Sequence, residues 1–295
     1  MVVADPRPSL WRVLDERNPR GGRLKGWLFV THPGPSLLVT AVTVAAAGLL
    51  IRRLPSERTA VGLVLVMLPA QLAIGAVNDW ADARSDAVSK TFKPIVRGCL
   101  RRGDAALLAA ALLAVSLGAA AFLGVGLLAT ALLAAGAGIS YDLLLKRTPA
   151  ALIAWWAGFT AVPLTAMVIT GRLRGSLEAV PLALLLAVAL LIANGLPDAE
   201  ADRLAGARTL PSVLGERLSR TLLSTAMLLA AGYVLLLKAG LGQDGLGWVA
   251  AAVLASGALA GAPAAPARRL GFPLLAICVA VATVSWLAAL PVPGA

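Results

Sequence analysis

The stretch AVGLVLVMLPAQLAIGAVNDWADARSD at residues 60–86 passes from an apolar run directly into a cluster of acidic side chains. The run from 60 to 78 contains no charged residue, and its apolar positions are continuous rather than alternating, which predicts a lipid-buried helix. Asp79, Asp82 and Asp86 then lie on one helical face if the helix continues past Asn78, because they are spaced by three and four residues.

A second acidic cluster follows another apolar run. Asp198, Glu200 and Asp202 come directly after the apolar segment at 179–196. Asp198 and Asp202 share one helical face, whereas Glu200 points elsewhere and is the expected secondary partner. Two such clusters in an otherwise oily chain predict two halves of one site.

The composition is that of an integral membrane protein. Of the 295 residues, 59% are hydrophobic and 14% are charged, with a mean hydropathy of +0.85. A soluble domain would carry about 25% charged residues. The bilayer allows only helices or closed barrels, and the Leu- and Ala-rich runs predict an all-α fold. The net charge of +11 is then explained by the membrane and not by nucleic acid.

Nine transmembrane spans are predicted, although several are shorter than the roughly 20 apolar residues that a crossing needs. They lie at 36–51, 60–78, 105–120, 122–140, 150–170, 179–196, 219–237, 247–262 and 272–290. We expect residues 36–295 to form one transmembrane domain. Residues 1–35 form a basic segment, either interfacial or a disordered tail, on the cytoplasmic side.

The basic residues indicate the orientation. With nine spans, 20 of the 26 Lys and Arg residues fall on the side that carries the N-terminus and both acidic clusters. The positive-inside rule places that side in the cytoplasm. We therefore expect a multi-pass protein of a bacterial cell membrane, with its site on the cytoplasmic face.

Clustered carboxylates at a membrane boundary repel one another and are costly to desolvate, and a hard cation with oxygen ligands removes that cost. Mg²⁺ suits two facing clusters because it takes few protein carboxylates, keeps waters and shares phosphate oxygens. The same face supplies basic groups that suit a diphosphate. These are Lys93, Arg97, Lys146, Arg147, Arg203 and Arg208. A simpler interpretation, that acidic and basic residues only cap spans, does not explain two spaced clusters each followed by cations.

Three segments resemble the UbiA-type intramembrane prenyltransferases, in the right order and over most of the chain. The first is Asn78-Asp79-x-x-Asp82-x-x-x-Asp86 with Lys93-Pro94 after it. The second is Tyr141-Asp142 with Lys146-Arg147, and the third is Asp198-x-Glu200-x-Asp202-Arg203 with Arg208 after it.

The resemblance implies about nine helices around a central cavity capped by cytoplasmic motif loops. It implies Mg²⁺-dependent transfer of a prenyl group from an allylic diphosphate to a lipophilic acceptor, most commonly an aromatic or quinone precursor. Carried over to this chain, the metal ligands are Asn78, Asp82, Asp86, Asp198 and Asp202. The predicted catalytic residues are Asp79, Asp82, Asp198 and Tyr141. The diphosphate would contact Asn78, Lys93, Arg97, Lys146, Arg147, Arg203 and Arg208.

Other residues are predicted to line the cavity. Asn194 interrupts an apolar span four residues before Asp198 and is a candidate for contacting substrate. The candidates to stabilise an allylic cation are Trp80, Tyr141 and the Trp155-Trp156-Phe159 segment, although an interfacial belt is the stronger interpretation of Trp155 and Trp156.

The chain also departs from the family pattern. The family often has Arg-Pro after the first motif and at the entrance of the first span, where this chain has Lys93-Pro94 and His32-Pro33. The simplest interpretation of His32, the only histidine, is an interfacial position. A phosphate contact and a general base are its alternatives.

Three other functions fit parts of the pattern. A terpene cyclase of the same fold would use the diphosphate site without an acceptor, and a phosphoribosyl donor with a polyprenyl phosphate would give another transfer. A cation-coupled transporter is disfavoured because its carboxylates usually lie at mid-membrane. The acceptor, the prenyl chain length, the general base and the oligomeric state are not determined by the sequence.

Overall fold

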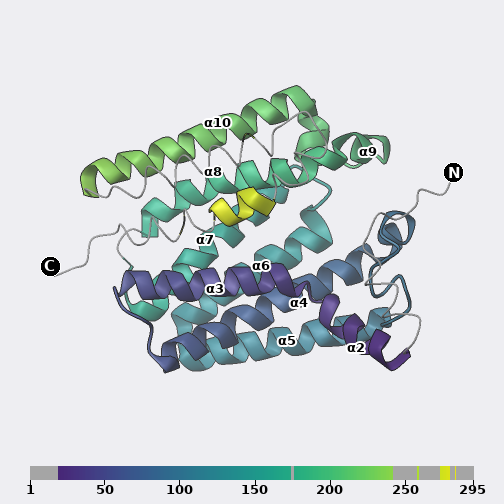
Figure 1. Ribbon diagram of the computed structural model, residues 1–295, viewed down its shortest axis with the longest axis horizontal. Helices are drawn as coiled ribbons and strands as arrows, with labels where there is room; N and C mark the ends of the chain where they lie inside the picture. Colours follow the sequence, from purple (N-terminus) through teal and green to yellow (C-terminus); the bar gives the residue numbers. More distant parts are fainter. Residues whose placement is uncertain (1–18, 174–175, 242–257, 259–272, 280–282, 284–295) are drawn as a thin grey trace.

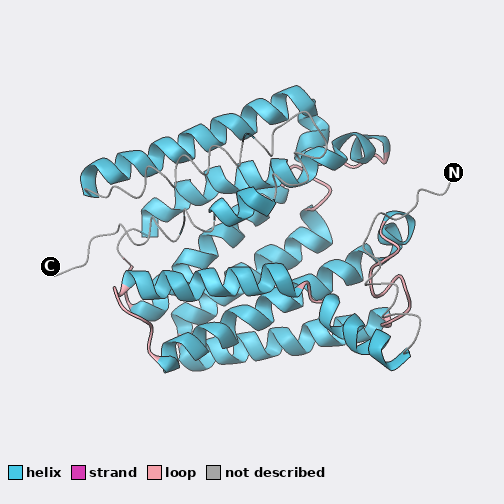
Figure 2. Cartoon of the chain, in the orientation of Figure 1, coloured by secondary structure: helices cyan, strands magenta, loops and turns pink. Residues whose placement is uncertain are grey.

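A computed structural model of the protein describes residues 19–173, 176–241, 258, 273–279 and 283. Within these residues every regular element is a helix and none is a strand, as Figure 2 shows. The long helices are α3 (Pro33–Leu50), α4 (Glu57–Ser89), α5 (Arg102–Leu123), α6 (Val125–Ser140), α7 (Ala151–Thr170), α8 (Ser176–Gly195) and α10 (Leu210–Leu241). Four short elements are α2 (Pro19–Phe29), the π-turn η1 (Tyr141–Leu145), the 3-10 turn η2 (Leu196–Asp198) and α9 (Ala199–Leu204).

The long helices run back and forth, so that successive connections alternate between the two ends of the bundle (Figure 1). Six helical segments of the described residues are long and apolar enough to cross a membrane. They correspond to the first six predicted spans, which confirms the all-α membrane fold. The predicted spans at 247–262 and 272–290 fall largely outside the described residues.

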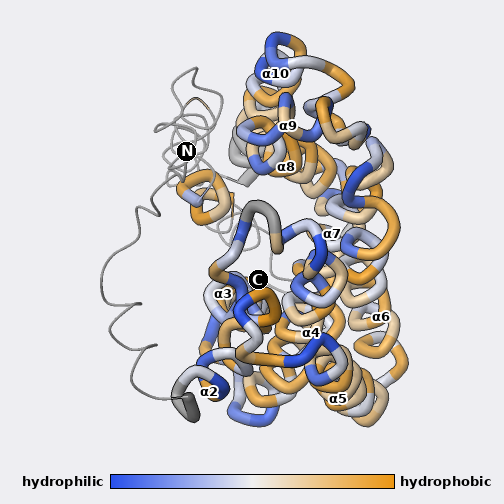
Figure 3. The backbone as a smooth tube through the Cα atoms, turned by 90° about the vertical axis from the view of Figure 1, so that its right-hand side faces the viewer, coloured by the Kyte–Doolittle hydropathy of each residue, from blue (hydrophilic) through white to orange (hydrophobic). Residues whose placement is uncertain are grey.

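The motif-bearing connections lie at the same end of the bundle. This end carries α2, α9, the α4–α5 connection and the turn before α7, toward the right of Figure 1. Figure 3 looks at that end, where hydrophilic segments are concentrated in the connections. The alternation of the helices therefore gathers segments that are far apart in the sequence.

Helix α4 carries the first acidic cluster because it continues well beyond its apolar run. Its N-terminus is capped by Ser56, whose hydroxyl accepts the Thr59 N–H at 3.2 Å, and Glu57 in its first turn suits the helix dipole. It ends at Ser89, so Asp79, Asp82 and Asp86 are all helical. This confirms that the helix continues past Asn78, which was the condition for the three aspartates to share one helical face.

The break between the third and fourth spans lies at a single residue. Gly124 separates α5 from α6 with φ 137° and ψ 159°, a conformation that only glycine adopts without strain. A backbone break also occurs at Gly215 inside α10, with φ 76°. The continuous part of α10 after Gly215 is helical over residues 219–237, and the span predicted there stays a prediction.

The main core lies between α3, α7, α8 and α10. Helix α8 contributes most of it, with Leu190 and Ile192 among its fully buried side chains. In lipid, such packing stabilises through close van der Waals contact rather than exclusion from water. A second cluster lies between α4, α5 and α6, and there the Ser116 hydroxyl of α5 donates to the Val66 carbonyl of α4 at 2.6 Å.

We predict that Ile192→Ala destabilises the bundle, whereas Ile153→Ala does not. Ile192 is 0% exposed and Ile153 is 63% exposed, so only the first substitution leaves a cavity. A loss of about 2–5 kcal/mol is expected for Ile192→Ala. Thermal unfolding of both variants in detergent micelles checks this, and equal losses in the two variants would contradict the assigned core.

Candidate functional site

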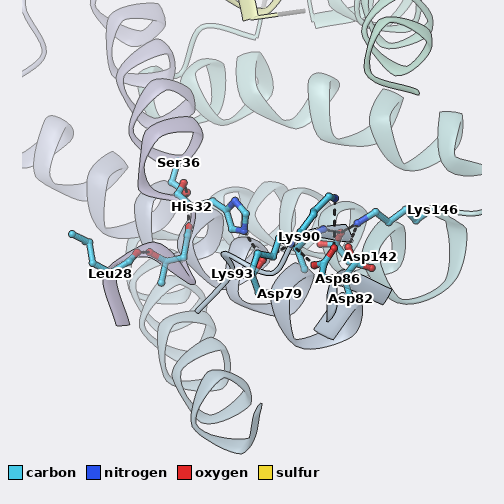
Figure 4. A network of polar contacts seen from close by, with 12 residues as sticks. Leu28, His32, Ser36, Asp79, Asp82, Asp86, Lys90, Lys93, Asp142 and Lys146 are labelled. Carbon is cyan, nitrogen blue, oxygen red and sulfur yellow. Dashed lines mark hydrogen bonds and ion pairs between the residues drawn. The ribbon is translucent and has the colours of Figure 1, made fainter. Parts of the chain in front are cut away.

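The first cluster binds a lysine from the following loop. Lys93 Nζ lies 2.7 Å from Asp79 Oδ1 and 2.6 Å from Asp86 Oδ2, as Figure 4 shows. Its side chain is 9% exposed, and those of Asp79 and Asp86 are 1% and 4% exposed. Buried carboxylates need such a partner because an unpaired buried charge is costly.

The loop geometry holds Lys93 in place. The Lys93 N–H donates to the Lys90 carbonyl at 3.0 Å, and the Arg97 N–H donates to the Lys93 carbonyl at 3.0 Å. Burial alone would lower the pKa of Lys93. Hydrogen bonds and charge from Asp79 and Asp86 outweigh that effect, so the pKa of Lys93 is raised above its ordinary value. Lys93 is therefore a cation fixed between two carboxylates.

A second lysine joins the first cluster to the loop after α6. Lys146 forms an ion pair and hydrogen bond with Asp82 and lies 3.9 Å from Asp142 Oδ1. Asp142 in turn accepts a hydrogen bond from Asn78 Nδ2 at 2.7 Å. This bond fixes the Asn78 amide, whose oxygen lies 3.4 Å from Lys93 Nζ.

The position of Lys146 depends on a local widening of the helix. Residues Tyr141–Leu145 form a π-turn, and the Lys146 N–H donates to the Tyr141 carbonyl at 2.8 Å. Such turns occur frequently at functional sites, where they change the direction of side chains. The widening brings Asp142 inside the protein, where it is 8% exposed.

The second cluster lies on a broken helix end. Helix α8 ends at Gly195, before Pro197, which disfavours a continued helix, and the chain passes through η2 into α9. Asp198 and Asn194 are exposed at this end of the bundle. Asp202 is half-buried and accepts the Thr209 hydroxyl at 3.1 Å. Glu200 instead pairs with Arg203 through two hydrogen bonds of 2.9 and 2.6 Å, as expected of a carboxylate that points elsewhere.

The two clusters are linked through the loop after α6. The Arg208 N–H donates to the Arg147 carbonyl at 3.0 Å, next to the lysine that binds Asp82. Together these loops line a pocket of about 400 Å³. Its lining is Arg147, Thr148, Pro149, Ala205, Gly206, Ala207 and Arg208, with no carboxylate. One continuous series of contacts thus runs from α4 to α9.

The predicted site residues fall into two groups. Asn78, Asp79, Asp82, Asp86, Lys93 and Lys146 form one contact network, and Arg147 and Arg208 line the adjoining pocket. Arg97 is exposed on the loop, and Arg203 is engaged with Glu200. Within the described residues, no three Asp, Glu, His or Cys side chains converge closely enough to hold a metal by themselves. The metal roles stay predictions.

Aromatic rings extend from the π-turn into the bundle. The ring centroids of Tyr141 and Trp155 are 5.9 Å apart, as are those of Trp155 and Phe159, and Lys146 Nζ lies 5.9 Å from the Tyr141 ring. Trp80 differs, because the Arg102 guanidinium already lies 4.4 Å from its ring centroid. Basic side chains thus lie near the rings of both Trp80 and Tyr141, and the row of rings continues from Tyr141 to Trp155 and Phe159.

Sequence reasoning missed the partner of His32. Its Nε2 lies 2.8 Å from Asp79 Oδ1, across 47 positions of sequence. The contact depends on a close backbone approach, because a Cβ on Gly75 would lie 2.4 Å from the Thr31 carbonyl oxygen. Gly75 lies one helical turn before Asp79. A glycine at that position was the only local feature of the sequence that could have indicated a close approach of the Thr31–His32 backbone. An interfacial position alone does not describe His32.

We predict that Lys93→Met costs about 3–5 kcal/mol of stability, because it leaves two buried carboxylates without their cation. Lys90→Met is the matched control. Lys90 Nζ lies 3.6 Å from Asp86 Oδ1 but its side chain is 49% exposed, so about 0–1 kcal/mol is expected. Thermal unfolding near neutral pH measures both, and similar losses in the two variants would contradict the buried pairing.

The effect of Lys93 depends on pH in a defined direction. A raised pKa in the folded state means that its contribution to stability is complete below the unfolded value of about 10.4. It is lost as the pH rises through the raised folded pKa. The stability difference between wild type and Lys93→Met should therefore be constant near neutral pH. It shrinks in strong alkali, where Lys93 loses its proton, and in acid, where Asp79 and Asp86 become protonated. A difference that already falls between neutral pH and the ordinary lysine pKa would contradict this assignment.

Comparisons with known proteins agree with this geometry. The profile of the UbiA prenyltransferase family matches residues 37–269. A digeranylgeranylglyceryl phosphate synthase of Natronomonas pharaonis is 29% identical over 215 residues, covering 72% of this chain and 74% of that protein. The enzyme of the same name from Thermococcus kodakarensis is 27% identical over 228 residues, covering 77% and 81%.

Solved structures share the fold. A UbiA homologue from Archaeoglobus fulgidus bound to DMAPP and Mg²⁺ has a TM-score of 0.67 and 18% identity, covering 88% of this chain and 99% of that chain. A structure described for digeranylgeranylglyceryl phosphate synthase in membranes has a TM-score of 0.71 and 18% identity, covering 91% and 99%. With the family profile matching most of the sequence, this chain belongs to the UbiA prenyltransferase family and is a multi-pass membrane prenyltransferase.

Proposed function

We propose that the protein transfers a prenyl group from an allylic prenyl diphosphate to a hydroxyl of a lipid-like glycerol phosphate, with Mg²⁺ as cofactor. The observation that carries this proposal is the series of contacts from Asp82 through Lys146 and Arg147 to Arg208 and Asp202. It joins the two acidic clusters through two cationic loops, the one after α6 and the one after α9, where a metal-bound diphosphate needs them.

The donor set fits magnesium. Asn78, Asp82, Asp86, Asp198 and Asp202 offer only oxygen atoms, which Mg²⁺ prefers. Asn78 is oriented for this role, since its amide nitrogen is engaged by Asp142. Asp202 keeps one carboxylate oxygen beyond the one that accepts Thr209. Bound Mg²⁺ would supply Lewis acidity that stabilises the charge of the leaving diphosphate.

The protein side chains would carry out the remaining steps. Lys146, Arg147 and Arg208 stabilise the growing negative charge on the diphosphate, and preorganised donors of this kind are often the largest contribution to catalysis. Tyr141, Trp155 and Phe159 present aromatic faces to the allylic cation. The apolar helices exclude water, which would otherwise capture that cation.

The acceptor class is supported by the relatives. Both archaeal relatives are named for digeranylgeranylglyceryl phosphate, a glyceryl phosphate that bears two prenyl groups. All three glycerol oxygens of that compound are substituted, so the acceptor would be the glycerol phosphate with one prenyl group fewer. It offers a free hydroxyl as the nucleophile and a phosphate for the arginine-lined pocket. The aromatic or quinone-precursor acceptor expected from the resemblance stays a prediction and is the second acceptor to test.

We further propose nine spans around a central cavity, formed by residues 36–295, with the site on the cytoplasmic face of a bacterial membrane. The asymmetry of 20 among 26 basic residues supports this orientation. Residues 1–35 would lie at the same face, and the described helix α2 at Pro19–Phe29 is consistent with an interfacial lead-in.

We predict that Asp82→Asn and Asp198→Asn each lower Mg²⁺-dependent diphosphate release by about 10²–10³-fold, because each removes charge that balances the metal and the leaving group. Glu216→Gln is the control. It neutralises an exposed carboxylate on α10 and should retain activity. The assay supplies membranes with allylic diphosphates of several lengths, with and without prenylated glycerol phosphate or aromatic acceptors.

The acceptor dependence separates the candidate reactions. Diphosphate release that requires the glycerol phosphate supports the proposal. Release that requires an aromatic compound would show that the acceptor is aromatic and not a glycerol phosphate. Release without an acceptor, together with a cyclic product, would indicate a cyclase. No release above the Asp82→Asn blank with any donor would overturn the prenyl diphosphate assignment.

A further inference from the structure

Transfer to a hydroxyl needs a group that accepts the hydroxyl proton, and the residues discussed above do not provide one. The lysines and arginines of the site are donors, and four of the carboxylates are assigned to the metal. The other two are already engaged, Asp79 by Lys93 and Asp142 by Asn78 and Lys146. His32 lies beside the first cluster at the start of α3 and has no role in that mechanism. It is the only histidine of the chain.

The contact with Asp79 determines which nitrogen of His32 carries its proton. Asp79 Oδ1 lies 2.8 Å from His32 Nε2 and 2.7 Å from Lys93 Nζ. A carboxylate held against an ammonium group is ionised and can only accept hydrogen bonds. Nε2 therefore donates to Asp79, and the lone pair of the neutral ring is at Nδ1.

The backbone holds the ring in this orientation. His32 has φ 50° and ψ 60°, a left-handed conformation that is uncommon for any residue other than glycine. The close approach of Thr31 to Gly75 fixes the turn, and the Ser36 hydroxyl donates to the His32 carbonyl at 3.0 Å. Strain of this kind persists where the surrounding structure over-determines it, and such positions cluster at functional sites.

The ring remains open to a substrate. The His32 side chain is 38% exposed, whereas that of Asp79 is 1% exposed. Nδ1 has no hydrogen-bond partner among the described residues. The charged groups that act on this region are Asp79 on α4, Lys93 on the next loop and Asp142 on the π-turn. Contacts join His32 through Asp79 and Lys93 to Asn78, one of the predicted diphosphate contacts.

Resting on the proposed function, we propose that His32 is the general base of the transfer and that Asp79 orients it. The acceptor oxygen forms a bond to C1 of the prenyl group as the bond from C1 to the diphosphate oxygen breaks. The electron pair of that bond leaves with the diphosphate. The hydroxyl proton moves to Nδ1 of His32, and Asp79 stabilises the imidazolium. This assignment replaces a direct catalytic role for Asp79 with a positioning role.

The test uses His32→Gly. Glycine adopts positive φ without strain, so the variant should fold, and it creates a space that free imidazole can enter. Because general-base catalysis contributes about 10²–10⁴-fold, we expect transfer to the glycerol phosphate acceptor to fall by at least about 100-fold. Added imidazole should restore a measurable part of it. Mg²⁺-dependent binding of an unreactive thiolodiphosphate donor analogue should stay within about threefold of wild type.

Arg52→Gly is the matched control, because Arg52 has φ 56° and lies on the α3–α4 connection at the opposite end of the bundle. It should retain full transfer and show no response to imidazole. His32→Gln and Asp79→Asn complete the set, and Asp79→Asn should lower the transfer rate with wild-type acceptor affinity.

The outcomes are distinct. Unchanged transfer in His32→Gly, or a loss that imidazole does not restore, would overturn the base assignment. Loss of donor-analogue binding in step with transfer would instead make His32 part of the diphosphate site. If wild type binds the donor analogue but transfers nothing to a glycerol phosphate, the proposed acceptor fails before His32 is tested.

Discussion

The structure depends on the neutralisation of carboxylate charge at a membrane boundary. Asp79 and Asp86 are nearly fully buried, and charge in such a position is stable only with a close partner. The partners come from loops, since Lys93 lies on the α4–α5 connection and Lys146 follows the π-turn after α6. The same ion pairs that stabilise the carboxylates therefore fix the loops that form the site.

The helices could be predicted from the sequence because apolar runs of sufficient length have few alternatives in a bilayer. The bounds of the third and fourth spans, predicted at 105–120 and 122–140, were less well determined, since one glycine turn joins the two helices without a polar loop. For the second cluster, helical spacing was not a sufficient guide. The prediction that Asp198 and Asp202 share one face assumed a regular helix, whereas Pro197 breaks α8 and Asp198 lies at the end of a 3-10 turn.

Pairing across the bundle was the part that the sequence did not reveal. Lys93 was expected to contact a diphosphate, but it lies between Asp79 and Asp86. His32 reaches Asp79 only because Gly75 admits the Thr31 backbone, and a contact between such distant positions leaves no periodic pattern. Asp142 was noted beside Tyr141 but had no assigned role, and its bond to Asn78 depends on the π-turn. Local rules predict elements, whereas these contacts are tertiary.

The central claim is that the two acidic clusters form one metal–diphosphate site. The most direct test is electron paramagnetic resonance of Mn²⁺ bound together with an unreactive prenyl thiolodiphosphate, in wild type, Asp82→Asn, Asp202→Asn and the double variant. One shared site predicts that either single substitution removes most of the bound Mn²⁺ and that the double variant loses little more, since residues of one network are non-additive. Independent, additive losses from the two substitutions would show two separate sites and contradict the account.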